Sequence, residues 1–151
     1  MQLTRYTDYG IRILMYLAVQ PEREALFRIA EVTNVFDLSS NHVAKIIHQL
    51  GKLGYLKTIR GKSGGFKLAI AINEIQIGLL VRQLEHSLVA VNCEEPFCRF
   101  TPVCNLKGVL GKAVAAYLAV LDQYSLADIV NNKSELISTL PDLSISVFDM
   151  S

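Results

Sequence analysis

The three cysteines of this chain, Cys93, Cys98 and Cys104, lie within one short segment, and the sequence contains no other cysteine. Their C-x4-C-x5-C spacing lacks the C-x2-C pair of most structural zinc sites, and an odd number of thiols does not suit a disulfide framework. Iron–sulfur clusters are bound chiefly by cysteine thiolates. The segment therefore predicts a loop that holds an iron–sulfur cluster. A zinc site made from the cysteines and an acid is a minor alternative.

The composition indicates one compact domain, or a small domain with an appendage. The chain has 151 residues, 51% of them hydrophobic, so it can form a buried core. We see no apolar signal segment and no run of about 18 apolar residues that could cross a membrane. Because free thiols stay reduced in the cytosol, we expect a cytoplasmic protein.

The net charge of +1 hides a basic first half. Residues 1–80 contain ten Lys and Arg against six Asp and Glu, and residues 81–151 contain five against eight. No acid occurs between Asp37 and Glu74, where six basic residues lie. A stretch of this kind is typical of a surface that binds a polyanion, although charge alone suits an ordinary solvated face equally well.

The pattern inside this first half predicts a helix-turn-helix. Apolar spacing indicates helices over 8–20 and 27–33, and a third that starts at Ser39 or Ser40 and runs to about Leu53. Asn34 and Asp37 suit the turn before the third helix, since both tolerate tight backbone geometry. We expect the third helix to enter the major groove of double-stranded DNA.

This third helix has two distinct faces. Its apolar face, which must pack inward, consists of Val43, Ile46, Ile47 and Leu50. Its polar face consists of Asn41, Lys45, His48 and Lys52, flanked by His42 and Gln49. Asn41 and Gln49 suit adenine edges, and the lysines suit phosphate or guanine. The alternative is an amphipathic surface helix with no ligand.

A β-hairpin follows, with strands over 55–60 and 66–70. The glycines of the connecting Gly61-Lys62-Ser63-Gly64-Gly65 permit positive φ and close backbone approach, as expected of a DNA-binding wing. The residues predicted to contact DNA are Arg28, Ser39, Ser40, Asn41, His42, Lys45, His48, Gln49, Lys52, Arg60, Lys62, Ser63, Gly64 and Gly65.

Beyond the wing we expect a helix over 75–85, the cysteine loop over 86–103, a long helix over 104–124 and a short one over 125–131. Apolar residues recur on the long helix at spacings of four and three: Leu106, Leu110, Ala113, Tyr117, Val120 and Tyr124. We interpret it as a dimerisation helix, because a symmetric dimer suits a palindromic operator; a plain core helix is the alternative.

The predicted fold is mainly α with a small β-hairpin. Residues 1–74 form a winged helix-turn-helix domain, 75–103 a linking helix and the cysteine loop, 104–131 the dimerisation and terminal helices, and 132–151 a tail.

This order of elements resembles the family of winged-helix iron–sulfur regulators. The motifs that carry the resemblance are Thr7-Asp8-Tyr9-Gly10, Arg60-Gly61-Lys62-Ser63-Gly64-Gly65, Asn92-Cys93, Phe97-Cys98, Thr101-Pro102 and Leu126-Ala127-Asp128. Within the family the match is closest to the branch that senses nitric oxide. The resemblance implies a homodimeric, cluster-bearing repressor that releases its operator when nitric oxide attacks the cluster.

Two other regulators are weaker interpretations. The cluster-biogenesis branch of the family has five residues in both cysteine gaps and a histidine three positions after the last cysteine. Here the first gap is four and that position is Lys107. The other interpretation is a winged-helix regulator that senses thiol oxidation without a cluster. An enzyme is not expected, because no histidine–cysteine pairing is apparent.

Three cysteines leave one iron of a cubane cluster without a thiolate. The resemblance implies that Asp8 of the partner subunit supplies this ligand, and His86, Glu94 and Glu95 are further candidates. The alternative for Asp8 is structural, because an acid in the first turn complements the helix dipole and can pair with Arg12. A single oxygen ligand favours a 4Fe–4S cluster over a 2Fe–2S cluster.

Overall fold

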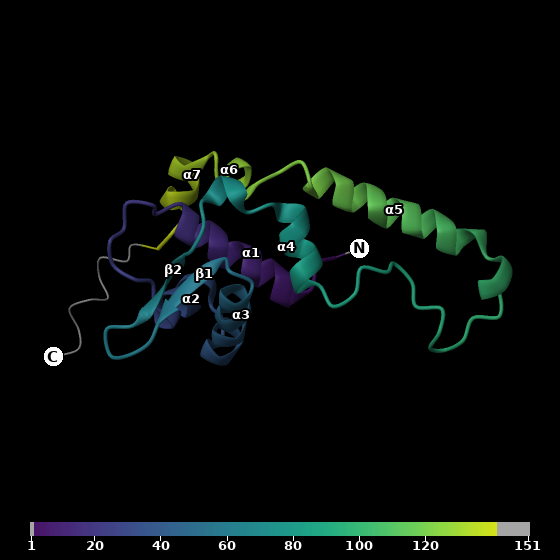
Figure 1. Cartoon of the computed structure of the whole chain (residues 1–151), viewed down its shortest axis with the longest axis horizontal. Helices are drawn as coiled ribbons and strands as arrows, with labels where there is room; N and C mark the ends of the chain where they lie inside the picture. The colour runs from purple at the N-terminus through teal and green to yellow at the C-terminus, as the bar shows by residue number, and fades with distance from the viewer. Residues whose placement is uncertain (1, 142–151) are drawn as a thin grey trace.

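The fold is mainly α-helical with one small antiparallel sheet, as predicted. Figure 1 shows the computed structural model, which describes residues 2–141. The elements are α1 (Arg5–Ala18), α2 (Ile29–Phe36), α3 (Ser40–Lys52), β1 (Leu56–Ile59), β2 (Gly65–Leu68), the 3-10 turn η1 (Ile72–Glu74), α4 (Ile77–Leu84), the 3-10 turn η2 (Thr101–Val103), α5 (Asn105–Leu121), α6 (Leu126–Ile129) and α7 (Lys133–Ser138). None of these helices is long and apolar enough to cross a bilayer.

The core forms around α1, which contributes the fully buried Ile13, Leu14 and Leu17. The helix begins at Arg5 because the Thr4 side chain accepts a hydrogen bond from Thr7 N at 3.3 Å and caps the first turn. The predicted start at residue 8 was therefore wrong. The repeat of apolar residues begins after the capping residue, so this repeat alone does not locate the start of the helix.

The helix-turn-helix consists of α2 and α3. Asp37 ends α2 with a φ of 51°, as its predicted role in the turn requires, but Asn34 lies inside the helix. The helix also starts later than the predicted 27–33. Phe27 instead exchanges two backbone hydrogen bonds of 2.9 Å with Phe66 of β2, so a tertiary contact overrides the local helical pattern.

The wing is the hairpin of β1 and β2, in which Leu56 pairs with Leu68 and Ile59 with Gly65. Its turn contains Gly61 at a φ of 109°, which only glycine adopts without strain. At the base of the hairpin the Tyr55 hydroxyl donates to Gln83 Oε1 of α4 at 2.5 Å. The wing is therefore attached both to α4 and, through Phe27, to the start of α2.

The helix α5 extends from the body of the molecule, and the cysteine loop runs out to its far end (Figure 1). The C-terminal end of α5, which lies next to the body, is joined to α4, since Ile77 N donates to Tyr124 O at 2.9 Å. The short α6 begins at Ser125, which forms a capping box with Asp128.

The segment predicted as a tail contains a further helix, α7. Leu136 of α7 and Leu140 just beyond it pack against the core, a contact that the local sequence does not indicate. The last part of the predicted tail, residues 142–151, lies outside the described residues.

Candidate DNA interface and cysteine loop

The polar face of α3 is exposed as predicted. Its apolar face is fully buried, and the four polar residues opposite are exposed, while His42 and Gln49 are half-buried beside them. This places the following candidate readers along one solvent-facing side of the helix: Asn41, Lys45, His48 and Lys52. The arrangement suits a helix that lies in the major groove.

Two predicted contacts near the start of α3 also have structural tasks. The Ser39 side chain caps the helix by accepting from His42 N at 3.3 Å, and Ser40 is the first helical residue. The His42 ring packs edge-on against Tyr9 of α1, with ring centroids 5.5 Å apart. His42 therefore links α1 to the candidate recognition helix.

Arg28 and the wing form one basic hollow. Arg28 directly precedes α2, and folding brings it beside Arg60, Lys62 and Gly64, which together line a hollow of about 440 Å³. Ser63 lies at the tip of the same hairpin and is exposed. None of the described residues that line this hollow is acidic. Three cations around one concavity suit a nucleic-acid backbone.

The cysteine loop is ordered by local hydrogen bonds. Cys98 N donates to Cys93 O at 3.0 Å and Thr101 N donates to Cys98 O at 3.0 Å, so two of the cysteines share one turn. The Asn92 carboxamide oxygen accepts from Glu94 N at 2.9 Å just beside this turn. Cys104 stands apart, as the residue that opens α5.

All three cysteines are free and half-buried. Within residues 2–141, no three side chains of His, Cys, Asp or Glu are gathered closely enough to hold a metal ion, so the loop does not form a closed site in the single chain. Three soft thiols with no competing disulfide nevertheless fit the ligand preferences of an iron–sulfur cluster.

Large apolar side chains around the cysteines are unusually exposed. The exposed fractions are 69% for Phe97, 74% for Phe100 and 81% for Val103. Residues of this size normally have a packing partner, and contiguous apolar exposure is typical of an interface.

The Asp8 carboxylate is paired with a basic residue of its own helix. This carboxylate forms a two-point ion pair with Arg12 one turn later on α1, with Oδ1–Nε and Oδ2–Nη2 distances of 2.8 Å each. The pairing expected as the structural alternative is thus present.

His86 lies beside the Tyr6 ring of α1, with centroids 6.4 Å apart, and Glu85 Oε1 accepts from Thr4 N at 2.7 Å.

The long helix α5 exposes part of the face predicted for dimerisation. Leu106 and Val120 are 61% and 53% exposed, whereas Tyr117 packs against the core. Tyr124, predicted as the last residue of this helix, lies beyond its actual end at Leu121 and is 45% exposed. Val109, which the sequence pattern did not include, is 60% exposed and lies on the same side as Val120.

Most of the chain matches one known protein family. Residues 3–132 match the Rrf2 family, described as iron-dependent transcriptional regulators. The chain belongs to the Rrf2 family. This Rrf2-family protein is therefore a transcriptional regulator rather than an enzyme, as predicted.

Two relatives of this Rrf2-family protein bear the name HTH-type transcriptional regulator NsrR. That of Halalkalibacterium halodurans is 48% identical over 139 residues, covering 90% of this chain and 94% of the relative. That of Shouchella clausii is also 48% identical over 139 residues, covering 90% and 93%. The family resemblance drawn from the sequence is confirmed.

Solved structures share the fold of this Rrf2-family protein. IscR of T. potens superposes with a TM-score of 0.69 at 24% identity, covering 90% of each chain. CymR, the global cysteine regulator of Bacillus subtilis, superposes with a TM-score of 0.65 at 23% identity, covering 87% of this chain and 98% of that one. Both likenesses extend well beyond the winged helix-turn-helix.

Proposed function

We propose that this protein is a homodimeric repressor that binds a palindromic operator, carries an iron–sulfur cluster and releases DNA in response to nitric oxide. One observation carries the proposal: the basic, acid-free surface of α3 and the wing belongs to the same chain as a three-thiol loop on an exposed helix. The similarity to regulators named NsrR favours the nitric-oxide-sensing branch, which the sequence resembles most closely.

The cluster ligands in this proposal are Cys93, Cys98 and Cys104 of one subunit and Asp8 of the partner subunit. When bound, the cluster supplies iron that reacts with nitric oxide. Asp8 must exchange its pairing with Arg12 for this role, and both side chains are accessible, with 36% and 52% of their surface exposed. A 4Fe–4S cluster suits this set of three thiolates and one carboxylate better than a 2Fe–2S cluster does.

Contacts between α1 and α3 link Asp8 to the DNA-reading surface. The Tyr6 hydroxyl donates to Lys45 O at 3.3 Å, and the Tyr9 ring touches His42. A shift of α1 therefore displaces α3. Because a dimer must seat two recognition helices about 34–36 Å apart, a small displacement of each is enough to weaken simultaneous docking.

The proposal is tested on protein purified without oxygen. We expect visible absorbance, bound iron and sulfide, tight binding to an operator, and loss of that binding as nitric oxide is added. Replacement of all three cysteines by serine should remove iron, sulfide and the response to nitric oxide together. A serine variant that still releases DNA on nitric oxide addition would disprove the role of the cysteines.

The role of Asp8 has its own test. Asp8→Ala should retain DNA binding by the winged helix but lose the normal response to nitric oxide, and Asp8→Cys, with a thiolate at the same position, should restore cluster retention. If Asp8→Ala kept full, nitric-oxide-sensitive operator binding, Asp8 would not be a ligand.

A thiol-redox regulator is the second candidate, favoured by the free Cys93 and Cys98 within one turn. Such a protein would contain neither iron nor sulfide after anaerobic purification, and an oxidant rather than nitric oxide would change its affinity for DNA.

A further inference from the structure

A second polar hollow lies on the opposite side of α3 from the wing. It has a volume of about 320 Å³ and is formed by parts of α1, α3 and α4 and by His86 just beyond α4, which are far apart in the sequence. The residues that line it are Tyr6, Lys45, Gln49, Gln83, Leu84 and His86. Only Lys45 and Gln49 were predicted from the sequence to contact DNA, so Tyr6, Gln83 and His86 are without an assigned role at this surface.

Gln83 presents hydrogen-bond donors to this hollow. Its side-chain oxygen accepts from the Tyr55 hydroxyl at 2.5 Å, which fixes which end of the carboxamide faces the wing. The amide nitrogen makes no hydrogen bond to any described residue, and the side chain is exposed. Because its oxygen already accepts a hydrogen bond, the Gln83 amide can donate from its N–H₂ group to an anionic acceptor.

Tyr6 supplies a second donor. Its hydroxyl reaches Lys45 O at 3.3 Å, a long hydrogen bond to a carbonyl that already belongs to the helical ladder of α3. The half-buried ring holds the hydroxyl at the rim of the hollow, beside the exposed His86. A stronger acceptor, such as a phosphate oxygen, would compete well for this hydroxyl.

The hollow carries positive charge without a balancing acid. Lys45 and His86 are its basic residues, and none of the described lining residues is acidic. The nearest acid in sequence, Glu85, is engaged elsewhere, because its Oε1 accepts from Thr4 N at 2.7 Å and from Thr4 Oγ1 at 3.1 Å. A converging set of cationic and neutral donors favours an anion over a neutral ligand.

The position of this hollow beside α3 indicates that the anion is a phosphate of the DNA backbone. Lys45 and Gln49 line this hollow, whereas Ile47, about 200° around the helix from Lys45, lines the hollow beside the wing. The major groove is about 12 Å wide, close to the diameter of a helix with its side chains, so a helix in the groove has one sugar–phosphate backbone on each side. The two hollows flank α3 as the two backbones flank the groove.

We propose that Tyr6, Gln83 and His86, together with Lys45, bind a backbone phosphate of the operator on the side of the major groove opposite the wing. The inference rests on the proposed function only in requiring that α3 read DNA; it is independent of the cluster. Inorganic phosphate has the same chemistry, so the experiment must separate a free anion from the DNA backbone.

The test compares two variants with a matched control in the full-length protein. Gln83→Glu keeps an oxygen for the Tyr55 hydroxyl but turns the free donor into a negative acceptor, and Tyr6→Phe removes only a hydroxyl. Gln123→Glu adds the same charge beyond the end of α5, where Gln123 Nε2 donates to Ala119 O and does not line the hollow. The affinity for DNA would be measured by fluorescence anisotropy over a range of salt concentrations. Two duplexes would be compared: an operator that the wild-type protein selects from random duplexes, and an unrelated duplex.

We expect Gln83→Glu to weaken binding to both duplexes about tenfold and to lower the slope of log affinity against log salt by about one, because a phosphate contact is lost whatever the sequence. Tyr6→Phe should weaken both duplexes about threefold to tenfold. Gln123→Glu should change neither affinity by more than about twofold. Replacement of Gln49, a base reader in the same hollow, should weaken the operator alone.

Unchanged affinity and salt slope in Gln83→Glu and Tyr6→Phe would overturn the inference. So would loss on the operator only, which would indicate base reading, and saturable binding of inorganic phosphate without any change in DNA affinity, which would indicate a free-anion site. Failure of the wild-type protein to select any duplex would instead refute the proposed function, so the two failures are distinguishable.

Discussion

Arg82 of α4 and Asp122, the residue after α5, form a two-point ion pair with Nη1–Oδ1 and Nη2–Oδ2 distances of 2.5 and 2.8 Å. Together with the hydrogen bond from Ile77 N to Tyr124 O, the pair fixes the near end of α5 to α4. The helix that carries the cysteine loop is therefore held at the end opposite the cysteines.

This pair predicts a pH dependence of folding. Hydrogen bonding from Arg82 holds the pKa of the Asp122 carboxyl below its ordinary value. A carboxyl with a lowered folded-state pKa stabilises the fold above its unfolded pKa of about 3.9, and this contribution is lost as the pH falls through the folded pKa. We expect urea denaturation to show less loss of stability for Asp122→Asn than for wild type between about pH 4 and pH 2. Equal loss in both proteins would show that the ion pair does not contribute.

Gly78 leaves room for the same ion pair. A Cβ at this position would overlap Asp122 Oδ1 and come within 2.9 Å of Arg82 Nη1. We expect Gly78→Ala to displace the pair while gaining about 1 kcal/mol of helix propensity, so that overall stability changes little. The check is a double-mutant cycle: Asp122→Asn should have almost no effect on the free energy of unfolding in the Gly78→Ala background. A full Asp122→Asn effect there would mean that the pair survives.

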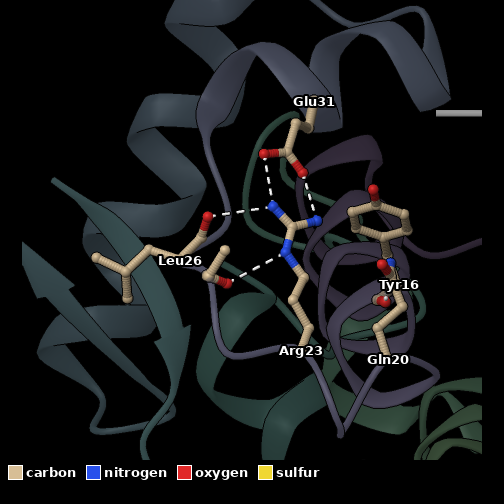
Figure 2. Close-up of polar contacts among 6 residues, drawn as sticks. Tyr16, Gln20, Arg23, Leu26 and Glu31 are labelled. Carbon is tan, nitrogen blue, oxygen red and sulfur yellow. Dashed lines mark hydrogen bonds and ion pairs between the residues drawn. The ribbon is translucent and has the colours of Figure 1, made fainter. Parts of the chain in front are cut away.

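Arg23 holds the segment between α1 and α2, and Glu31 completes its hydrogen bonds (Figure 2). The guanidinium donates to Leu26 O at 3.2 Å, pairs with Glu31 at 2.7 and 2.8 Å, and lies 4.2 Å from the centroid of the Phe27 ring. Glu31→Ala would leave a half-buried cation without its partner and should cost about 2 kcal/mol in urea denaturation. Glu31→Gln, which keeps one acceptor, should cost less. Equal stability of all three proteins would contradict this role.

The exposed side of α5 predicts a dimer that one charge should disrupt. Val120→Lys places an ammonium on the face with Leu106 and Val109, and we expect a shift from dimer to monomer in analytical ultracentrifugation. Gly111→Lys is the matched control, because Gly111 lies nine residues away, about 180° around the helix, with open space at its Cβ position. A dimer that survives Val120→Lys would place the interface elsewhere.

The contact between the wing and the start of α2 requires a glycine. A Cβ at Gly65 would overlap Phe27 O and lie 2.8 Å from Leu26 Cβ. Because the obstacle is backbone, Gly65→Ala should destabilise the protein by about 1–3 kcal/mol in urea denaturation. Gly51→Ala, whose Cβ would have only ordinary contacts at 3.8 Å, should instead be neutral or stabilising. Similar values for the two variants would refute this account.

Periodic apolar patterns predicted most of the fold. The faces of α3 and α4 were anticipated because each buries residues that repeat within a single helix, such as Ile46 and Leu80. The start of α2 and the existence of α7 were not, because Phe27 and Leu136 owe their conformations to partners distant in sequence. Tyr6 and Gln83 were missed as candidate site residues for the same reason.

The order of the residues alone shows which types occur together: three thiols in one loop, a basic stretch without acids, and helices with one apolar side. These follow from composition and short-range spacing, which need no knowledge of the fold. The packing of the elements was needed to show that Arg28 joins the wing, that Phe27 pairs with Phe66 of β2, and that donors from three helices surround one hollow beside Lys45. Such groupings depend on how helices pack, and packing is set by the whole core rather than by any local segment.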